Sequence, residues 1–237
     1  MVSCAPWPFP GGRVRFKMEA CFLYPRYPMS AAPLTFYSFP LSGHSHRVAL
    51  MLSLLDVPHR NVEVDLRSGA QKRPEFLALN AFGQVPVIDD NGVVVADSTA
   101  ILVYLCKRYN GQAWLPEDAV GAAAVQRWLS AASGPLAAGP AAARLVTVFG
   151  APYDVPATLA RAHALLAVME RELAATGYLA GAAPTLADVA CYTYVAHAPE
   201  GNVSLADYPR VRDWLARIEA LPRFVPMVAS PVGLRAA

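Results

Sequence analysis

The chain has 237 residues, 55% of them hydrophobic and 16% charged, and its 20 lysines and arginines against 18 acidic residues give a formal net charge of +2. This composition is typical of a globular core and excludes intrinsic disorder, and the small net charge gives no electrostatic reason to expect a nucleic-acid partner. The longest uncharged stretches, 128–143 and 189–199, are shorter than the roughly 20 residues of a membrane span, so we expect a soluble, cytoplasmic protein with no membrane partner.

Residues 1–32 differ from the rest of the chain because turn-forming prolines and glycines follow one another closely in this segment. Prolines at positions 6, 8, 10, 25 and 28 and the Gly11-Gly12 pair interrupt this segment too often for a helix or a central strand. We therefore predict a poorly ordered N-terminal extension over residues 1–32. Met29 is an alternative to Met1 as the start of the protein.

The first ordered elements are predicted from residue 34 onward. Residues 34–39 are rich in β-branched and aromatic side chains and predict a short strand. Apolar residues at helical spacing predict a helix over 45–55, with Ser42 or Ser45 as its N-cap.

Short strands and helices then alternate up to residue 109. The Asp-Asp-Asn-Gly sequence at 89–92 is a strong hairpin turn signal between two of these strands. The order strand, helix, strand before it implies one parallel crossover, so a mixed sheet is expected. The predicted elements are strands over 61–64, 85–88 and 93–96, and helices over 74–79 and 97–109.

The second half of the chain shows helical patterns and no strand signal. Thr185 and Asp188 have the spacing of a capping box at the start of an apolar helix that runs to about residue 198. Further helices are predicted from residue 156 and over 208–221. The predicted organisation is an α/β domain over 33–110, a linker over 111–118, an all-helical domain over 119–228 and a C-terminal tail over 229–237.

The four cysteines lie far apart and form neither a C-x-x-C pair nor a metal-ligand pattern, so they are interpreted as reduced thiols. His44 and His46 are too few ligands for a metal and are interpreted as loop residues. No metal is expected.

Five short motifs, in this order, resemble those of cytosolic glutathione S-transferases, and the segment around Ser42 resembles bacterial, serine-type members. They are the Phe39–Arg47 segment, the Lys72–Asn80 segment, Gly83-Gln-Val-Pro-Val87, Asp97-Ser98 and the Thr185–Asp188 box. The resemblance covers about residues 34–228. It implies a thioredoxin-like α/β N-terminal domain followed by an all-α C-terminal domain.

Glutathione is an anionic tripeptide, and the resemblance implies where each part of it binds. Asp97 and Ser98 stand at a predicted helix start, where free N–H groups attract an anion, although spacing alone fits an ordinary helix cap equally well. By resemblance, Ser98 holds the γ-glutamyl carboxylate and Asp97 pairs with the adjacent amino group. Lys72 is implied to contact the glycyl carboxylate.

The Gln84-Val85-Pro86 segment is the implied partner of the cysteinyl part of glutathione. A proline at this point of a strand pattern indicates an edge or a bulge. In the family the equivalent proline is cis, and the residue before it pairs through its backbone with the ligand. By resemblance, Val85 binds through its backbone and Gln84 through its side chain.

The residue that activates the thiol is implied to be Ser42, whose hydroxyl would donate a hydrogen bond to the glutathione sulfur. A thiol with a pKa of about 8.5 must lose about two pKa units to be mostly ionised at neutral pH, which takes roughly 2.7 kcal/mol. A hydrogen bond to a charged group and a helix N-terminus together supply this. Ser38 is the alternative, because it aligns with the tyrosine of tyrosine-type members. His44 is expected at the edge of the glutathione pocket.

The function implied by the resemblance is transfer of an alkyl or aryl group to the glutathione thiolate, as in detoxification. Phe39, Leu41 and residues near Trp128 are expected to line the pocket for a small, hydrophobic electrophile. A homodimer is implied as well. Two alternatives stay open: a glutathione-dependent peroxidase, reductase or isomerase on the same fold, and a non-catalytic glutathione S-transferase-like binding protein.

Overall fold

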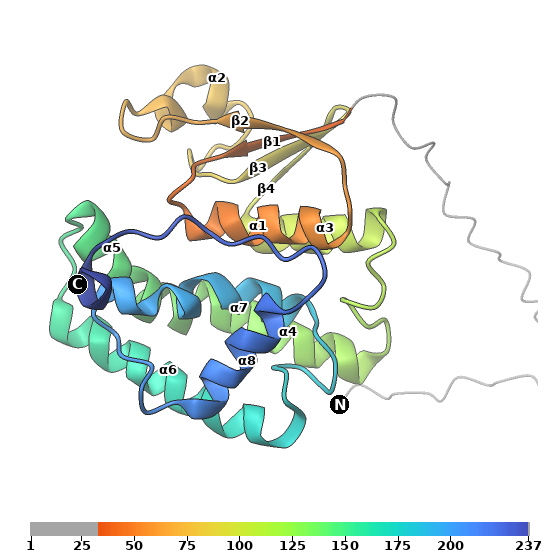
Figure 1. Cartoon of the computed structure of the whole chain (residues 1–237). Coiled ribbons are helices and arrows are strands. Elements are labelled where there is room, and N and C mark those ends of the chain that lie inside the picture. The colour runs from red at the N-terminus through yellow and green to blue at the C-terminus, as the bar shows by residue number, and fades with distance from the viewer. Residues whose placement is uncertain (1–32, 237) are drawn as a thin grey trace, which may run out of the picture. The chain divides into compact units, whose positions relative to one another are not determined.

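A computed structural model of the chain describes residues 33–236, and the extension predicted over 1–32 lies outside them. Its first half contains a four-stranded mixed sheet with the strand order β2-β1-β3-β4 (Figure 1). β1 pairs with β2 in parallel, and β1–β3 and β3–β4 are antiparallel, as the predicted crossover and hairpin require. The strands are β1 (Leu34–Ser38), β2 (His59–Glu63), β3 (Val87–Asp90) and β4 (Val93–Ala96).

Helices pack on both faces of this sheet, and the side chains of β1 alternate between the two faces. Leu34 and Phe36 point into the main core, where the sheet packs on α1 (Gly43–Leu54) and α3 (Ser98–Arg108). Tyr37 points to the other face and meets Phe76 of α2 (Pro74–Leu77) edge-on, with ring centroids 6.3 Å apart. A short 3₁₀ turn, η1 (Ala70–Lys72), precedes α2.

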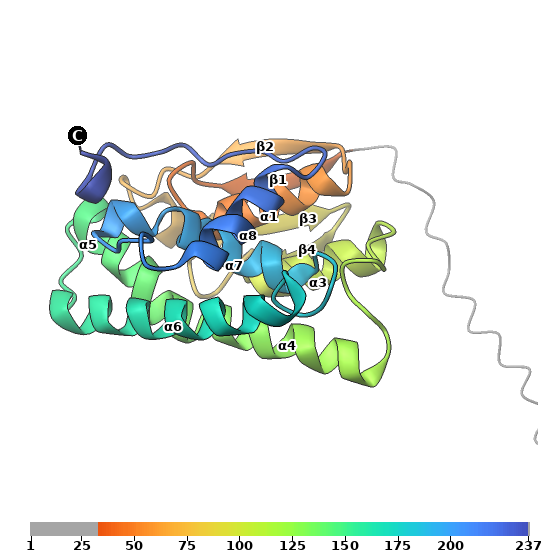
Figure 2. The same cartoon turned by 60° about the horizontal axis from the view of Figure 1, so that its bottom comes forward.

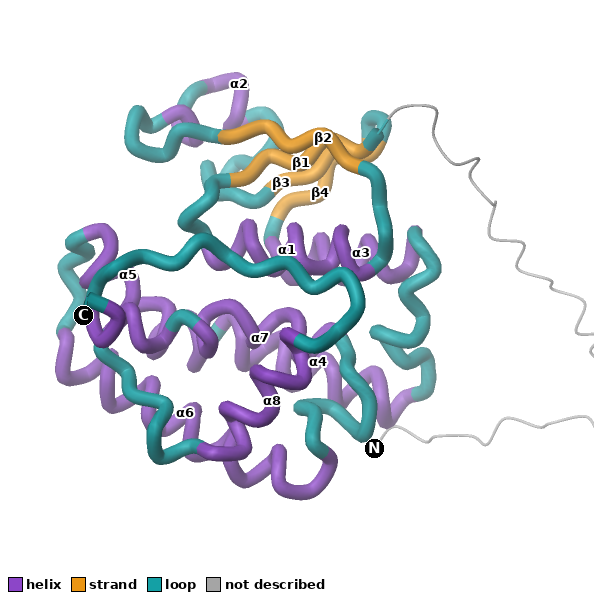
Figure 3. Tube along the Cα trace, in the orientation of Figure 1, coloured by secondary structure: helices purple, strands orange, loops and turns teal. Residues whose placement is uncertain are grey.

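The second half of the described chain is helical, and all four named strands lie before residue 97 (Figure 3). Its centre is α7, which is buried along its whole length and packs on both α1 and α4. The long α6 and the shorter α8 lie on the outer side of the helical layer (Figure 2). The helices are α4 (Ala119–Ser133), α5 (Ala142–Phe149), α6 (Val155–Thr176), α7 (Leu186–Ala196) and α8 (Pro209–Glu219).

The predicted capping box is confirmed at the start of α7. The Thr185 hydroxyl accepts a hydrogen bond from the Ala187 N–H, and the Asp188 carboxylate accepts one from the Thr185 N–H at 2.8 Å. Asp188 also accepts bonds from the Leu179 N–H and the Trp214 indole. Because the carboxylate is fully buried, these donors fix the start of α7 against α8 and the preceding loop.

Several sequence-based boundaries differ from the structure, and the differences at α1 and β3 have a clear local reason. α1 begins at Gly43, since Ser42 rather than Ser45 is its N-cap, so His44 and His46 are helical and not loop residues as predicted. β3 begins at Val87 because Pro86 has no N–H for a ladder bond. The uncharged stretch 128–143 contains the end of α4 and a π-helical turn, η2 (Ala137–Ala141), around Pro140.

The C-terminal segment after α8 runs along α1 and is held there by His46. The imidazole Nε2 lies 2.9 Å from the Val225 carbonyl oxygen, which can only accept, so Nε2 carries the proton and Nδ1 accepts from the Thr193 hydroxyl at 2.8 Å. Burial lowers the pKa of His46 to about 4, so the ring is neutral. Ser53 adds a hydrogen bond to the Arg223 carbonyl.

None of the helices within residues 33–236 has the length and apolar character to cross a membrane.

Candidate active site

A cleft of about 940 Å³ lies where the sheet domain meets the helical layer. One side is formed by the start of α1, by η1, by the loop before β3 and by the start of α3, and it carries most of the polar residues that line the cleft. The other side is formed by η2, α5 and Tyr194 of α7. The polar residues of the first side form the polar half of the cavity. The helical side, together with Phe39 and Leu41 of the turn before α1, forms the apolar half.

Ser42 lies at the centre of the cleft as the N-cap of α1. Its hydroxyl oxygen accepts a hydrogen bond from the Ser45 N–H at 3.2 Å, so its own hydrogen is left to donate to another group. The tight turn before it is closed by the Ser42 N–H, which donates to the Phe39 carbonyl, and by the Phe39 N–H, which donates to the Ser45 hydroxyl. This places a hydroxyl donor at the positive end of a twelve-residue helix.

Ser38, the alternative to Ser42, is not among the residues that line the cleft. It is buried, and its hydroxyl donates to the Asn61 side chain at 2.6 Å, across the parallel β1–β2 pair. Its hydrogen is therefore used within the sheet.

Asp97 and Ser98 form the start of α3, and both line the cleft. Asp97 caps the helix: its Oδ1 accepts from the Thr99 and Ala100 N–H groups and from the Thr99 hydroxyl, whereas Oδ2 bonds to no other described residue. Burial opposes ionisation of Asp97, but these donors hold its pKa below the usual value. One carboxylate therefore caps the helix and still offers an oxygen to a cation in the cleft.

Behind Ser98 lies a buried guanidinium. Arg47 of α1 is 1% exposed and donates from Nη1 to the Ser98 hydroxyl at 3.1 Å, while its Nε and Nη2 have no hydrogen-bond partner among the described residues. His44 Nδ1 lies 3.3 Å from the same hydroxyl, and burial together with the Arg47 charge lowers the pKa of His44 to about 3. The buried positive charge of Arg47, with two donors that have no hydrogen-bond partner among the described residues, thus favours an anion at Ser98.

The remaining predicted binding residues line the opposite end of the polar half. The Val85–Pro86 bond is cis, as the resemblance implies. Asn80 donates to the Gln84 carbonyl at 2.8 Å, and the Lys72 ammonium donates to the Phe82 carbonyl at 3.1 Å. Lys72, Gln84, Val85 and Pro86 all line the cleft.

The apolar half is formed by Phe39 and Leu41 together with Leu145, Phe149 and Tyr153. The expectation that residues near Trp128 belong to this pocket is wrong: Trp128 lines a separate groove between α4 and α6. The helical contribution comes instead from η2, α5 and the loop after α5, because the chain turns back toward the sheet after α4.

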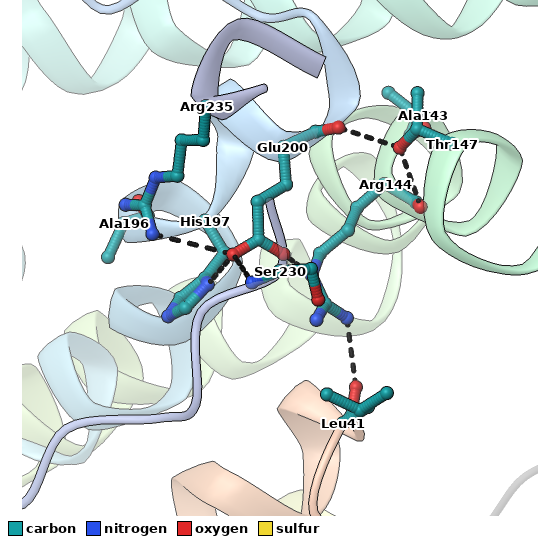
Figure 4. Close-up of polar contacts among 9 residues, drawn as sticks. All are labelled: Leu41, Ala143, Arg144, Thr147, Ala196, His197, Glu200, Ser230 and Arg235. Atoms are coloured by element: carbon teal, nitrogen blue, oxygen red, sulfur yellow. Dashed lines mark hydrogen bonds and ion pairs between the residues drawn. The ribbon is translucent and has the colours of Figure 1, made fainter. Parts of the chain in front are cut away.

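A buried ionic network connects this cleft to the C-terminal segment (Figure 4). Arg144 of α5 is 1% exposed, donates from Nη1 to the Leu41 carbonyl at 2.9 Å and donates from Nε to Glu200 at 2.6 Å. Burial opposes ionisation of Glu200, but donors including the Ser230 N–H, His197 and Arg144 hold its pKa below the usual value. The Leu41 carbonyl, next to Ser42, is therefore connected through Arg144 and Glu200 to the C-terminal segment.

Sequence reasoning identified the polar half of this site and missed Arg47, Arg144 and Tyr194. Arg47 lies within the Phe39–Arg47 motif, so its position beside the helix start was visible. Arg144 and Tyr194 lie more than 100 residues from Ser42 in the sequence, and no local pattern connects them to it.

The described residues supply neither a cluster of metal ligands nor a reactive cysteine thiol. Among residues 33–236, no group of three or more His, Cys, Asp or Glu side chains could hold a metal ion. Cys106 and Cys191 are buried, and burial raises the pKa of each thiol to about 12. Neither is suited to act as a nucleophile.

Two family models match this chain: "Glutathione S-transferase, N-terminal domain" over residues 41–108 and "Glutathione S-transferase, C-terminal domain" over residues 112–217. A curated relative, glutathione S-transferase 3 from Zea mays, is 37% identical over 84% of this chain and 95% of its own length. The disulfide-bond oxidoreductase YfcG from Escherichia coli is 29% identical over 78% of this chain and 89% of its own.

Solved structures agree with these sequence relationships. A structure from Rhodopseudomonas palustris, described as a possible glutathione S-transferase, superposes with a TM-score of 0.76 at 34% identity. The match covers 85% of this chain and 93% of that one.

Proposed function

This chain belongs to the glutathione S-transferase family, and we propose that it is a glutathione transferase that joins the glutathione thiolate to a small, apolar electrophile. The observation that carries the proposal is the Ser42 hydroxyl, which caps α1 in the same cleft as Ser98 and its supporting Arg47. An anion site and a thiol-activating donor thus lie in one cavity.

The polar half of the cleft matches the charges of glutathione. We assign the γ-glutamyl carboxylate to Ser98, where Arg47 and the α3 N-terminus provide positive charge, and the adjacent ammonium group to Asp97 Oδ2. The Val85 backbone and the Gln84 side chain pair with the cysteinyl part, and Lys72 takes the glycyl carboxylate. His44, at the edge of the pocket, stays neutral and keeps the Ser98 hydroxyl oriented.

Reaction then needs only a thiolate and a positioned electrophile. Ser42 donates to the sulfur and favours its ionised form, and the thiol proton leaves to solvent. The sulfur forms a bond to the electrophilic carbon as the leaving group departs with its electron pair, or as an activated double bond accepts the pair. Phe39, Leu41, Phe149 and Tyr153 suit an apolar, aromatic acceptor.

The test of this proposal is product formation by the purified full-length chain. We expect retention on immobilised glutathione and a thioether product with a general aromatic electrophile, identified by mass spectrometry. Retention without any thioether product would favour a non-catalytic binding protein. Absence of both would refute the assignment of the cleft.

A second candidate function is glutathione-dependent disulfide reduction, which the name of the relative YfcG supports. The residue at position 42 argues for the transferase, because a serine cannot form a mixed disulfide with glutathione. A low-molecular-weight disulfide and an aromatic electrophile should be compared at equal glutathione concentration. Turnover of the disulfide alone would favour the reductase.

The proposal includes a cytoplasmic location and a role in detoxification, since a glutathione conjugation reaction consumes the reduced glutathione pool of the cytosol. Bacterial, serine-type membership belongs to the same proposal: the serine type is supported by Ser42 lining the cleft, and bacterial membership rests on the resemblance of the segment around Ser42.

We also propose a homodimer, in which Phe82 of each subunit occupies the groove between α4 and α6 of the other. The Phe82 side chain is 81% exposed on the loop before β3. The groove is about 560 Å³ and is lined mainly by apolar side chains, including Trp128, Leu165 and Val168. One ring and one groove on each copy fit a two-fold interface, in which every contact occurs twice.

Replacing Phe82 by serine should therefore shift the protein to monomers. Loss of two buried rings removes about 3–6 kcal/mol of association free energy, which raises the Kd of the dimer by about 10²- to 10⁴-fold. Sedimentation velocity over a concentration series measures this change. Val228→Ser, at another exposed apolar residue, is the matched control, and an unchanged dimer in the Phe82 variant would place the interface elsewhere.

A further inference from the structure

Tyr194 of α7 brings a second hydroxyl to the helix end that Ser42 caps. Its side chain is 4% exposed and lines the cleft together with Ser42 and His44. The ring of His44 meets it edge-on, with centroids 5.1 Å apart. Tyr194 comes from the most buried helix of the protein, so its ring is held by packing and not by a mobile loop.

The hydroxyl end of the Tyr194 ring lies against the first residue of α1. A Cβ atom added to Gly43 would lie 2.7 Å from Tyr194 Cζ, the carbon that carries the hydroxyl, and 2.8 Å from Cε1. Only a residue without a Cβ permits this approach. Gly43 follows Ser42 directly, so the phenol and the serine hydroxyl occupy the same end of the helix.

The surroundings of the phenol keep it protonated and direct its hydrogen away from the helix. Burial raises the pKa of Tyr194, although the charges of Arg47 and Arg144 and the N–H groups of His44 and Gly43 oppose this. Gly43 and His44 are the first two residues of α1, where backbone N–H groups have no partner within the helix, and their N–H groups are near enough to the phenol oxygen to lower its pKa. A neutral hydroxyl whose oxygen accepts from backbone donors has its own hydrogen left for another acceptor.

We propose that Tyr194 is a second catalytic donor, whose hydroxyl binds the glutathione sulfur alongside Ser42. This inference rests on the proposed transferase function and deepens it. Two neutral donors at one helix N-terminus stabilise a thiolate without a metal or a protonated histidine. The proposal also explains why the tight contact at Gly43 is built into the fold, since it brings the phenol up to the sulfur site.

The pKa of the bound glutathione thiol is the quantity that tests whether Tyr194 and Ser42 both donate to the sulfur. The charged and titratable groups that line the same cleft are His44 of α1, Lys72 of η1, Asp97 at the start of α3, Arg144 of α5, Tyr153 in the loop after α5 and Tyr194 itself. Arg47 of α1 lies behind Ser98 and does not line the cleft. Substitution of Tyr194 by phenylalanine changes none of these charges. A shift in the thiol pKa in that variant is then due to the lost hydroxyl.

The experiment compares Tyr194→Phe with Tyr192→Phe. Tyr192 is two residues away on the same helix, and its hydroxyl donates to Glu219 at 2.9 Å outside the cleft. The thiol pKa of bound glutathione is measured from thiolate ultraviolet absorbance against pH, and the glutathione Kd by calorimetry. In Tyr194→Phe we expect kcat/KM at neutral pH to fall about tenfold, the thiol pKa to rise by about one unit and Kd to stay within about twofold.

The double variant Ser42→Ala/Tyr194→Phe should raise the thiol pKa further than either single variant, toward the value of a free thiol, about 8.5, with only the α1 N-terminus left to stabilise the thiolate. Tyr192→Phe should leave the thiol pKa at the wild-type value. If Tyr194→Phe does not fold, Gly43→Ala takes its place: the added methyl group displaces the phenol while keeping its hydroxyl, and it should raise the thiol pKa as well.

A wild-type thiol pKa in Tyr194→Phe would overturn the inference and leave the transferase proposal intact. If the wild-type protein itself left the thiol pKa of bound glutathione unchanged, the failure would lie with the proposed activation at Ser42. The two failures are therefore distinguishable by measurements on the wild-type protein and one variant.

Discussion

Replacement of Ser42 by alanine is expected to lower kcat by about 10- to 100-fold and to leave the glutathione Kd within about twofold. The lost interaction is a hydrogen bond to a charged sulfur, which is worth about 1.5–3 kcal/mol, and each 1.36 kcal/mol of lost stabilisation costs a factor of ten in rate. Binding should change little, because the proposed contacts to the two carboxylates are made by Ser98 and Lys72, which this substitution leaves in place. Stopped-flow conjugation at saturating glutathione measures kcat, and calorimetry measures Kd.

The same substitution removes the N-cap of α1, since the Ser42 oxygen accepts from the Ser45 N–H. Loss of a serine cap costs about 0.5–2 kcal/mol of unfolding free energy, whereas glycine at a cap costs only a few tenths. Ser42→Gly should therefore lose activity as Ser42→Ala does, with less loss of stability. Asp118→Ala, which removes the α4 cap, should lose stability and keep full activity.

Full activity in Ser42→Gly would refute the assignment of the thiol-activating role to Ser42. An equal loss of activity in Asp118→Ala would show that destabilisation alone lowers kcat, and the loss in the Ser42 variants would then not identify Ser42 as the thiol-activating residue.

The sequence predicted those parts of the molecule that depend on neighbouring residues. The hairpin between β3 and β4 depends on the turn at 89–92, and the start of α7 depends on Thr185 and Asp188, so short patterns were sufficient for both. The α/β domain followed by a helical domain was predicted from the order of such elements and from the family resemblance.

The residues that sequence reasoning missed are placed by tertiary packing. Arg144 reaches the Leu41 carbonyl across 103 residues of chain, and Tyr194 reaches Gly43 only because α7 packs on α1. The wrong expectation for Trp128 has the same origin: helical periodicity shows that a residue is buried but not which neighbour it meets. An acceptor pocket built where two domains meet cannot be derived from either one alone.

The Glu200 network is the part of the site whose disruption should cost the most stability. Glu200 is fully buried, and its carboxylate accepts from Arg144, His197, the Ser230 N–H and Arg235. Glu200→Gln keeps the shape and removes the charge, which leaves the buried Arg144 guanidinium without its counter-ion. Breaking a buried ion pair in this way costs about 3–5 kcal/mol of unfolding free energy.

For a chain of this length that loss lowers Tm by about 6–20 °C, at about 2–4 °C per kcal/mol. Urea unfolding and a thermal scan at neutral pH measure it. Glu172→Gln is the matched control, because Glu172 forms an exposed ion pair with Arg127 and such pairs contribute at most about 1 kcal/mol.

The effect of Glu200→Gln should also depend on pH in a defined direction. The pKa of Glu200 is held below its ordinary value of 4.5, so the charged network stabilises the fold above pH 4.5. This contribution is lost as the pH falls through the lowered pKa, and the stability difference between the wild-type protein and Glu200→Gln should shrink with it. A difference that stays constant down to acid pH would mean that packing, and not the charge of Glu200, holds Arg144 against the Ser42 turn.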